Sequence, residues 1–323
     1  MSLRRKSLRA LSLSFVLVAI VAAGFVVSGF ARGEPTGSHQ NMIGPQSPAA
    51  AGSENVTSSP ATAAVSRAIP DAWLGHSGRL RAVIDTPTSL APMVADLSPE
   101  PLTPGIHDLG VVTPAGTPFY AVTMLPYETK VGSRIRGYYV GNWPVKPGVE
   151  RYAQPAGFIE VTPENAQTQV SEQFRLGDFV THDQANVWPK FLVLKPKLLD
   201  KLELISEGLA ARGLPSKLHV MSGFRTPQYN EQGVGEKGGR ASLSRHMYGD
   251  ASDVFVDADG DGRMDDLNGD GQVTVADARV LFSVAESVEA ANPDLIGGLS
   301  PYPANSAHGP FVHVDTRGVK ARW

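Results

Sequence analysis

Two short segments in the last quarter of the chain alternate apolar and polar residues, and a helical pattern lies between them. Residues 253–257 are DVFVD and residues 310–315 are PFVHVD. A period of two over such a length is typical of β-strands. Between them, residues 276–291 repeat apolar residues at helical spacing, and Asn292-Pro293 follows as a stop. Strands joined through a long helical connection predict an α+β fold.

The same pattern begins near residue 166. Five apolar residues recur at helical spacing before Gly213, namely Leu198, Leu199, Leu202, Ile205 and Leu209. The segment LHVMSGF that follows reads as a strand and leads into Arg225. We therefore expect residues 166–323 to form one domain with a central antiparallel sheet.

The chain begins with a targeting pattern, which we place at residues 1–33. Four basic residues, Arg4, Arg5, Lys6 and Arg9, precede an uncharged stretch of 22 residues, 10–31. A secretory apolar region has about 7–15 residues and a membrane span about 20, so an uncleaved anchor fits better. The sequence GFA before Arg32 leaves a cleaved signal peptide as the alternative. Either way, the rest of the chain is expected to be exported to the periplasm or cell envelope.

Two further regions separate this segment from the α+β pattern. Residues 34–70 are rich in Ala, Ser, Thr, Pro and Gly and contain no aromatic residue. Such a composition buries too little apolar surface to offset its ordering entropy, which predicts a flexible linker. Residues 71–165 carry short β-branched and aromatic runs, such as TPFYAVTML and GFIEVTP, between Gly and Pro. They predict a small β-rich domain with no evident chemistry.

Composition limits the classes of site and partner. The chain has 323 residues and a formal net charge of −3, which argues against a nucleic-acid partner. It has no cysteine, so any metal must be held by nitrogen and oxygen.

Three residues in the α+β region form a potential zinc site of this kind. His246 lies in SRHMYGDASD, Asp253 ends that segment, and His313 lies in FVHVD. Two imidazoles and one carboxylate leave a net positive centre, which lowers the pKa of a bound water to about 7. The strand period directs Asp253 and His313 away from the neighbouring valines. A lone histidine is more often an ordinary surface or core residue, so the inference depends on the combination.

The combination resembles a known family. The pattern S-x-H-x-x-G-x-A-x-D from Ser244 to Asp253, followed by H-x-D at His313, resembles the zinc D-Ala-D-Ala carboxypeptidases and murein peptidases. The segment SGFRTPQYN (222–230) resembles the family's upstream segment, and the likeness covers about residues 170–323. It implies that His246, Asp253 and His313 bind zinc. It also implies that Arg225 binds a substrate carboxylate or stabilises the oxyanion.

The residues also depart from that family at one point. Members commonly carry a glutamate or histidine base two or three residues before the last ligand, where this chain has Phe311 and Pro310. Asp315 shares a strand face with His313 and is either the base or a carboxylate that orients His313. His308 and Asp250 are reserve candidates for the base. Ser244 is expected to orient a ligand, or else to be a turn hydroxyl.

An acidic insert, residues 257–277, separates the second and third zinc ligands. It has seven aspartates and one arginine, a net charge of −6 (−7 + 1), and would repel itself without cations. Its spacing resembles the twelve-residue calcium loops of dockerins. The predicted calcium ligands of this loop are Asp266, Asn268, Asp270, Gln272 and Asp277, and a second, overlapping register begins with Asp257, Asp259 and Asp261. The alternative is a solvated acidic loop.

These features predict an exported zinc metallopeptidase that hydrolyses peptidoglycan stem or crosslink peptides, with zinc and calcium as cofactors. Its partners would be peptidoglycan peptides and, through residues 10–31, the membrane. The alternative is a catalytically inactive zinc- and calcium-binding protein of the cell wall, acting as a binding or scaffold module.

Overall fold

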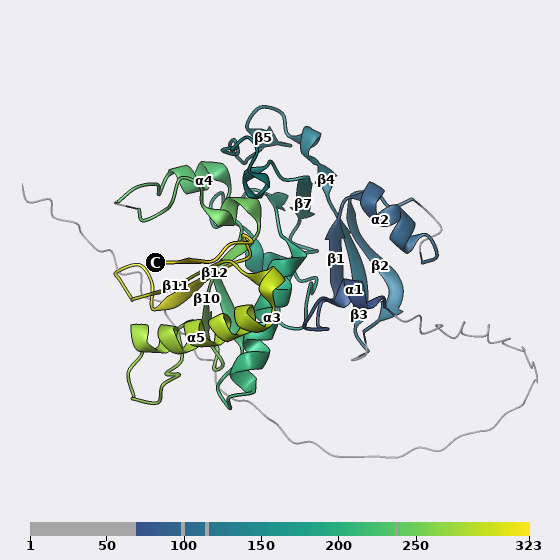
Figure 1. Cartoon of the computed structure of the whole chain (residues 1–323). Coiled ribbons are helices and arrows are strands. Elements are labelled where there is room, and N and C mark those ends of the chain that lie inside the picture. Colours follow the sequence, from purple (N-terminus) through teal and green to yellow (C-terminus); the bar gives the residue numbers. More distant parts are fainter. Residues whose placement is uncertain (1–68, 98–100, 114–115, 237) are drawn as a thin grey trace, which may run out of the picture. The chain divides into compact units, whose positions relative to one another are not determined.

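Five strands from the second half of the chain pair into one sheet, in the order β13-β11-β12-β10-β9 (Figure 1). The structure is a computed structural model that describes residues 69–97, 101–113, 116–236 and 238–323. All neighbouring strands are antiparallel except β11 and β13, which are parallel. The strands are β9 (Leu218–Ser222), β10 (Ala251–Val256), β11 (Gly298–Tyr302), β12 (Phe311–Asp315) and β13 (Ala321–Arg322).

The alternating residues of β10 and β12 form strands where the sequence predicts them. Val254, Val312 and Val314 are fully buried in the apolar core. Asp253 lies directly opposite His313 in the register of the two strands. Residues opposite each other on antiparallel strands share a face, so the pairing brings two potential ligands together.

The two long helices, α3 (Pro196–Ala210) and α5 (Val275–Ala291), contact each other, and α5 also packs on β11 and β12 (Figure 1). All five apolar residues of the predicted helical pattern in α3 are buried. Gly208 allows a close helix crossing, because a Cβ there would lie 2.8 Å from Cγ1 of Val284. Thr274 and Asp277 form a capping box that begins α5 at Val275.

A second sheet, in the order β1-β3-β2, belongs to the first part of the described chain. Its elements are α1 (Asp71–Leu74), β1 (Ala82–Asp85), α2 (Pro87–Val94), β2 (Gly105–Val112) and β3 (Pro118–Thr123). They enclose a small core of their own, in which Trp73 and Phe119 stack with ring centroids 6.0 Å apart.

Short strands connect this part to the five-stranded sheet. They form a β4-β7-β8 sheet and a β5-β6 hairpin. Their bounds are β4 (Leu125–Pro126), β5 (Arg134–Ile135), β6 (Tyr138–Tyr139), β7 (Gly157–Val161) and β8 (Lys190–Leu192). The short helices are η1 (Tyr127–Thr129), η2 (Glu150–Tyr152), η3 (Leu176–Phe179), α4 (Pro227–Glu231), η4 (Arg245–Tyr248) and η5 (Pro293–Leu295). The sequence predicts a domain boundary at residue 165. In the structure, β7 pairs with β8 and the main apolar core contains residues from both sides of that position.

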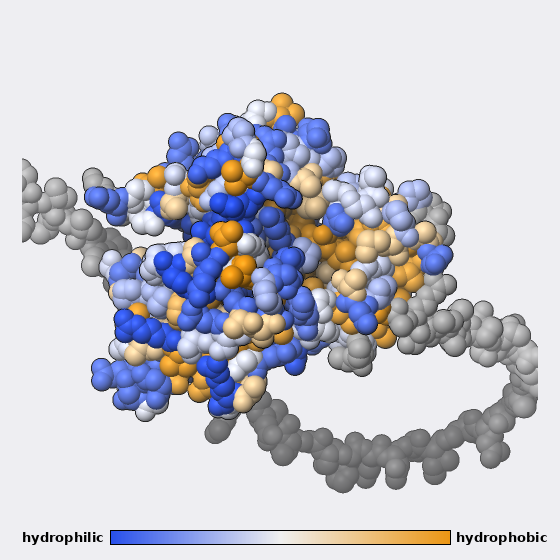
Figure 2. All heavy atoms as spheres, in the orientation of Figure 1, coloured by the Kyte–Doolittle hydropathy of each residue, from blue (hydrophilic) through white to orange (hydrophobic). Residues whose placement is uncertain are grey.

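The predicted mixture of helices and strands is therefore confirmed, and the described residues belong to one compact unit, Ala61–Trp323. On the face in view, hydrophilic residues predominate, with hydrophobic patches between them (Figure 2). The predicted anchor (1–33) and almost all of the linker (34–70) lie outside the described residues. Within the described ranges, no helix has the length and apolar character that a membrane span requires.

Candidate metal centre

Three buried side chains from separate elements meet beside the five-stranded sheet: His246 from η4, Asp253 from β10 and His313 from β12. Nε2 of His246 lies 3.3 Å from both Oδ1 of Asp253 and Nδ1 of His313, and the latter two atoms are 3.0 Å apart. Three atoms that bind a tetrahedral zinc ion at 2.0–2.1 Å lie about 3.3 Å from one another. The three residues therefore fit a metal ion, and their nitrogen and oxygen donors suit zinc among other transition metals.

Main-chain geometry sets the orientation of His246. Its Nδ1 donates a hydrogen bond to the carbonyl of Gly223 at 2.7 Å, which leaves the lone pair of Nε2 toward the other two ligands. Gly249 ends η4 with a φ of 70°, and a Cβ there would lie 2.4 Å from the carbonyl oxygen of Val193. The glycine of the sequence motif is thus required by both its φ and its contact.

His313 is held by two carboxylates. Its Nδ1 faces Asp253, and its Nε2 lies 3.0 Å from Oδ2 of Asp315. Asp315 is fully buried and also accepts hydrogen bonds from the main-chain N–H of Gly298 at 2.7 Å and from the guanidinium of Arg317. A carboxylate with these bonds corresponds to the orienting role, the second of the two roles that the sequence leaves open for Asp315.

The electrostatics agree with this arrangement. Burial would raise the pKa of Asp253 and of Asp315, but His246 and His313 hold the pKa of Asp253 well below the ordinary range, and His313 and Arg317 do the same for Asp315. Burial would lower the pKa of His313, but hydrogen bonds to the two aspartates raise it to about 9. Burial lowers the pKa of His246. Asp315 is thus a weak proton acceptor, and the two aspartates are anionic.

Arg225 follows β9 and lies beside Asp253 of the metal centre. Its Nη2 donates to the hydroxyl of Ser222 at 3.1 Å and lies 3.5 Å from Oδ2 of Asp253. Its Nε is buried and has no hydrogen-bond partner among the described residues. A buried donor without a partner is costly, so this N–H is available to a bound ligand.

The other predicted residues of this region lie outside the ligand group. Ser244 is the N-cap residue of η4, and within the described chain its hydroxyl forms no hydrogen bond with a ligand. Asp250 forms a buried ion pair with Arg245 and a second with Lys195. The ring of His308 lies at 80° to that of Phe311 and bonds to Asn305. None of these three contacts the ligand atoms.

The acidic insert folds as two repeats offset by nine residues. Asp257 accepts the N–H groups of Gly260 and Gly262, and Asp266 accepts those of Gly269 and Gly271. Two and four residues after each of these aspartates, another side chain accepts a hydrogen bond from the main-chain N–H of the residue two positions later in the sequence. These side chains are Asp259, Asp261, Asn268 and Asp270. The four glycines have φ between 72° and 82°. Both predicted registers therefore exist as loops.

The potential ligands in the two loops differ in their surroundings. Asp257, Asp259 and Asp265 have carboxylate oxygens within 4.8 Å of one another, and Asp265 is absent from the predicted set. Asp277 is fully buried, and its oxygens accept the N–H groups of Leu267, Asn268 and Thr274. Gln272 is exposed in the second loop. Asp277 thus ties the loop to the start of α5 through main-chain bonds.

Several residues around the metal centre were missed by the sequence analysis. Arg317 binds Asp315, Ser222 binds Arg225, and Trp143 donates its Nε1–H to the carbonyl of Met247 at 2.6 Å. His182 bonds to the main chain of Met221, and burial and the charge of Arg225 lower its pKa. Ser222 begins the quoted segment 222–230, and Arg317 lies four residues after His313, whereas Trp143 and His182 lie in no recognised motif.

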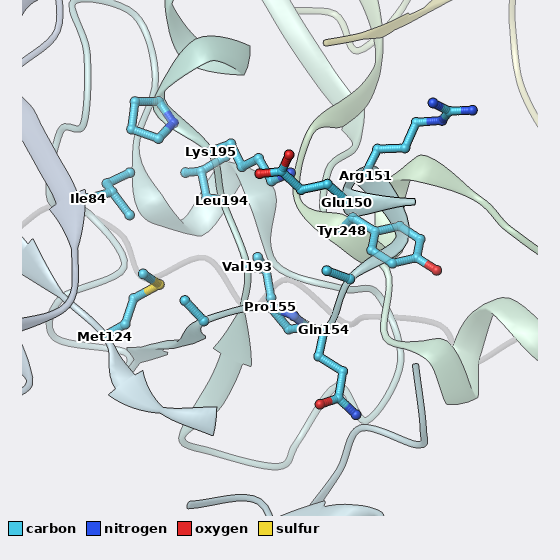
Figure 3. Close-up of a pocket in the computed structure, with 13 residues that line it drawn as sticks. Ile84, Met124, Glu150, Arg151, Gln154, Pro155, Val193, Leu194, Lys195 and Tyr248 are labelled. Carbon is cyan, nitrogen blue, oxygen red and sulfur yellow. The ribbon is translucent and has the colours of Figure 1, made fainter. Parts of the chain in front are cut away.

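A pocket of about 280 Å³ lies apart from this group (Figure 3). Apolar residues including Ile84, Met124 and Leu194 line it, and Glu150 and Lys195 also line it. None of the three metal-ligand residues lines this pocket, so it is not the metal centre. Comparison of the chain with family models, curated proteins and solved structures gives no match.

Proposed function

We propose that the protein is an exported zinc metallopeptidase that hydrolyses peptidoglycan stem or crosslink peptides as a D,D- or L,D-carboxypeptidase or endopeptidase. The observation that supports this most directly is the buried group of His246, Asp253 and His313, with the unpaired Nε of Arg225 beside it. The motif resemblance in the sequence points to the same residues. In this proposal, the five-stranded sheet is the central sheet of the peptidase domain, and residues 71–165 are a β-rich module.

In the proposed reaction, each residue of the site has its own role. A bound zinc ion supplies a Lewis acid and lowers the pKa of a water. Arg225 binds the substrate carboxylate or the developing oxyanion through its planar guanidinium. Asp315, fixed by Arg317 and Gly298, holds His313 in the tautomer that directs Nδ1 to the metal.

The alternative is a protein that binds zinc but does not hydrolyse peptides. It is favoured by one observation: Asp315, the predicted base, has its carboxylate occupied by Arg317 and a main-chain N–H, and Pro310 and Phe311 cannot accept a proton. Digestion of purified sacculi with and without a chelator separates the two functions. New peptide products that disappear with chelator and return with zinc support the peptidase, and unchanged sacculi support the binding protein.

We also propose that the acidic insert binds calcium and that residues 10–31 tether the protein to the membrane. The three clustered carboxylates of Asp257, Asp259 and Asp265 support the first proposal, since calcium prefers oxygen ligands. The second rests on the sequence alone. Fractionation of cells that express the full chain, followed by salt and detergent extraction, tests the tether: release by salt alone contradicts it.

A further inference from the structure

The metal ligands lie in the middle of a row of side chains that crosses four strands. Ser222 of β9 is opposite Asp253 of β10, Asp253 is opposite His313 of β12, and His313 is opposite Ser300 of β11. Directly opposed residues share one face of a sheet. The four side chains therefore form one transverse row, with the two metal ligands flanked by a serine on each side.

Each outer serine bonds to a different residue, Ser222 to a side chain and Ser300 to the main chain. Ser222 accepts a hydrogen bond from Nη2 of Arg225 at 3.1 Å. Ser300 donates to the main-chain oxygen of Trp323 at 2.5 Å. The row thus has a cationic end at β9 and an aromatic end at β11, with the metal centre between them.

The ring of Trp323 is exposed and yet fixed in place. The residue is 55% exposed. Its ring centroid lies 5.3 Å from that of His313 and 5.4 Å from the guanidinium carbon of Arg317, and its Nε1 donates to the hydroxyl of Tyr302 at 2.5 Å. Isolated apolar residues on a surface need no explanation, but a large ring immobilised beside a buried ligand group resembles the preorganised anchors of binding sites.

The aromatic surface continues along the strands. Tyr302 stacks on Phe311, with centroids 4.7 Å apart and planes within 7°. The pair lies two residues along from Ser300 and His313 in the same register and on the same face. Trp323, Tyr302 and Phe311 therefore form an aromatic wall that begins beside the potential metal ligand His313.

We infer that this aromatic wall is a binding subsite for the apolar side chain of the residue that contributes the scissile carbonyl. The inference rests on the proposed peptidase function. If Arg225 takes the carboxylate on the leaving side, the opposite end of the row receives the acyl side. Aromatic rings gain most from contact with apolar groups, so the wall selects peptides with an apolar residue at that position.

Metal-directed probes test the subsite without requiring peptide hydrolysis. The zinc-loaded full chain is titrated with acetohydroxamate and with hexanohydroxamate, whose head groups are identical and whose tails differ in apolar length. We expect hexanohydroxamate to bind at least about tenfold more tightly, as a few buried methylenes allow. Trp323→Ala should remove most of that preference, and Trp323→Phe should retain it in large part. Trp188→Ala, an exposed tryptophan with no contact to the ligands, is the matched control.

The outcomes separate the inference from the function on which it rests. An unchanged preference in zinc-loaded Trp323→Ala overturns the subsite. If that variant fails to bind zinc, Tyr302→Ala replaces it, because Tyr302 does not touch a ligand residue, and an unchanged preference there also overturns the subsite. A Trp323-dependent preference without digestion of sacculi supports an apolar ligand site beside the metal centre, but it contradicts the peptidase function and with it the assignment of that site to the acyl residue. Failure of both probes to bind the wild type contradicts the metal centre and the subsite together.

Discussion

His313 directs its two ring nitrogens to two different aspartates: Nδ1 lies 3.0 Å from Oδ1 of Asp253, and Nε2 lies 3.0 Å from Oδ2 of Asp315. Only the first contact faces His246 and the potential metal. The second is surrounded by Arg317 and the N–H of Gly298. One aspartate is thus placed to bind a metal, and the other to hold the histidine that binds it.

Asp315→Asn should therefore weaken zinc binding more than it slows a fully loaded enzyme. Loss of a group that orients a metal ligand typically costs about 10–100-fold in affinity or activity. We expect a loss of that order in zinc affinity, measured by competition with a chromogenic chelator. A variant with wild-type zinc affinity and a rate lower by about 10²–10⁴ would instead make Asp315 the base.

Zinc uptake should release one proton from His313 at pH 7.5, and a bound water with a pKa of about 7 should release most of a second. In the metal-free protein the pKa of His313 is raised to about 9, whereas the pKa values of His246 and Asp253 are lowered. Only His313 then carries a proton that the metal must displace. Calorimetric titration in two buffers of different ionisation enthalpy measures the number. Above about pH 10 the contribution of His313 should be lost and the total should approach one, and a total below one at pH 7.5 contradicts the assignment.

The same raised pKa predicts how the stability of the metal-free protein depends on pH. A folded-state pKa above the unfolded value of about 6.5 gives stability that is complete below pH 6.5 and is lost as the pH rises through about 9. The melting temperature of chelator-treated protein should therefore fall between pH 6.5 and 9.5. The contribution should be absent from His313→Gln, so an equal fall in that variant would assign the dependence to other groups.

Arg225→Lys should lose activity and keep both its zinc and its fold. A lysine ammonium cannot reproduce the planar guanidinium or its unpaired Nε–H, and loss of one donor to an oxyanion costs about 10²–10³-fold in kcat. Rates on sacculi and zinc content are measured together. Arg212→Lys is the matched control, because the guanidinium of Arg212 bonds to Ser283 and Ser287 on α5 and not to the metal centre. Undiminished turnover in Arg225→Lys would assign Arg225 a structural role.

Trp143→Phe should disturb the metal centre, although Trp143 belongs to the part of the chain before residue 165. Trp143 donates to the carbonyl of Met247, the neighbour of His246, across 104 positions of sequence. Phenylalanine leaves this buried carbonyl without its partner, at a cost of about 1–3 kcal/mol. We expect a lower melting temperature and weaker zinc binding. Trp188→Phe, at an exposed site, should change neither, and an unaffected Trp143→Phe would mean that the region before residue 165 does not support η4.

The sequence predicted that His246, Asp253 and His313 lie together, because the signals that place them are local. Strand alternation assigns Asp253 and His313 to the polar face, and the pairing of β10 with β12 makes them neighbours. The glycine at 249 marks a turn that only a residue tolerant of positive φ accepts. These features depend on a few adjacent residues, so they can be recognised without the fold.

The supporting contacts could not be predicted in the same way. The carbonyl of Gly223 that orients His246 has no side-chain signature, and the pairing of Trp143 with Met247 depends on long-range packing. Whether Asp315 acts as a base or orients His313 depends on the groups to which its carboxylate bonds. One of these groups is the N–H of Gly298, which belongs to a different strand, β11. Strand alternation gives the direction of a side chain but not the groups that it meets.

Calcium should stabilise the acidic insert, and the two loops offer a way to test where. A ligand that binds only the folded state raises the melting temperature by mass action. Asp257→Asn and Asp266→Asn change the first residue of each loop, so each should reduce the thermal shift that millimolar calcium causes in chelator-treated protein. Asp71→Asn, outside the insert, should leave the shift unchanged.

Asp277→Asn should behave differently, because the carboxylate of Asp277 bonds to three main-chain N–H groups and caps α5. That variant should lose about 0.5–2 kcal/mol of stability even without calcium. Absence of any calcium-dependent shift or heat in the wild type would leave residues 257–277 as a solvated acidic loop.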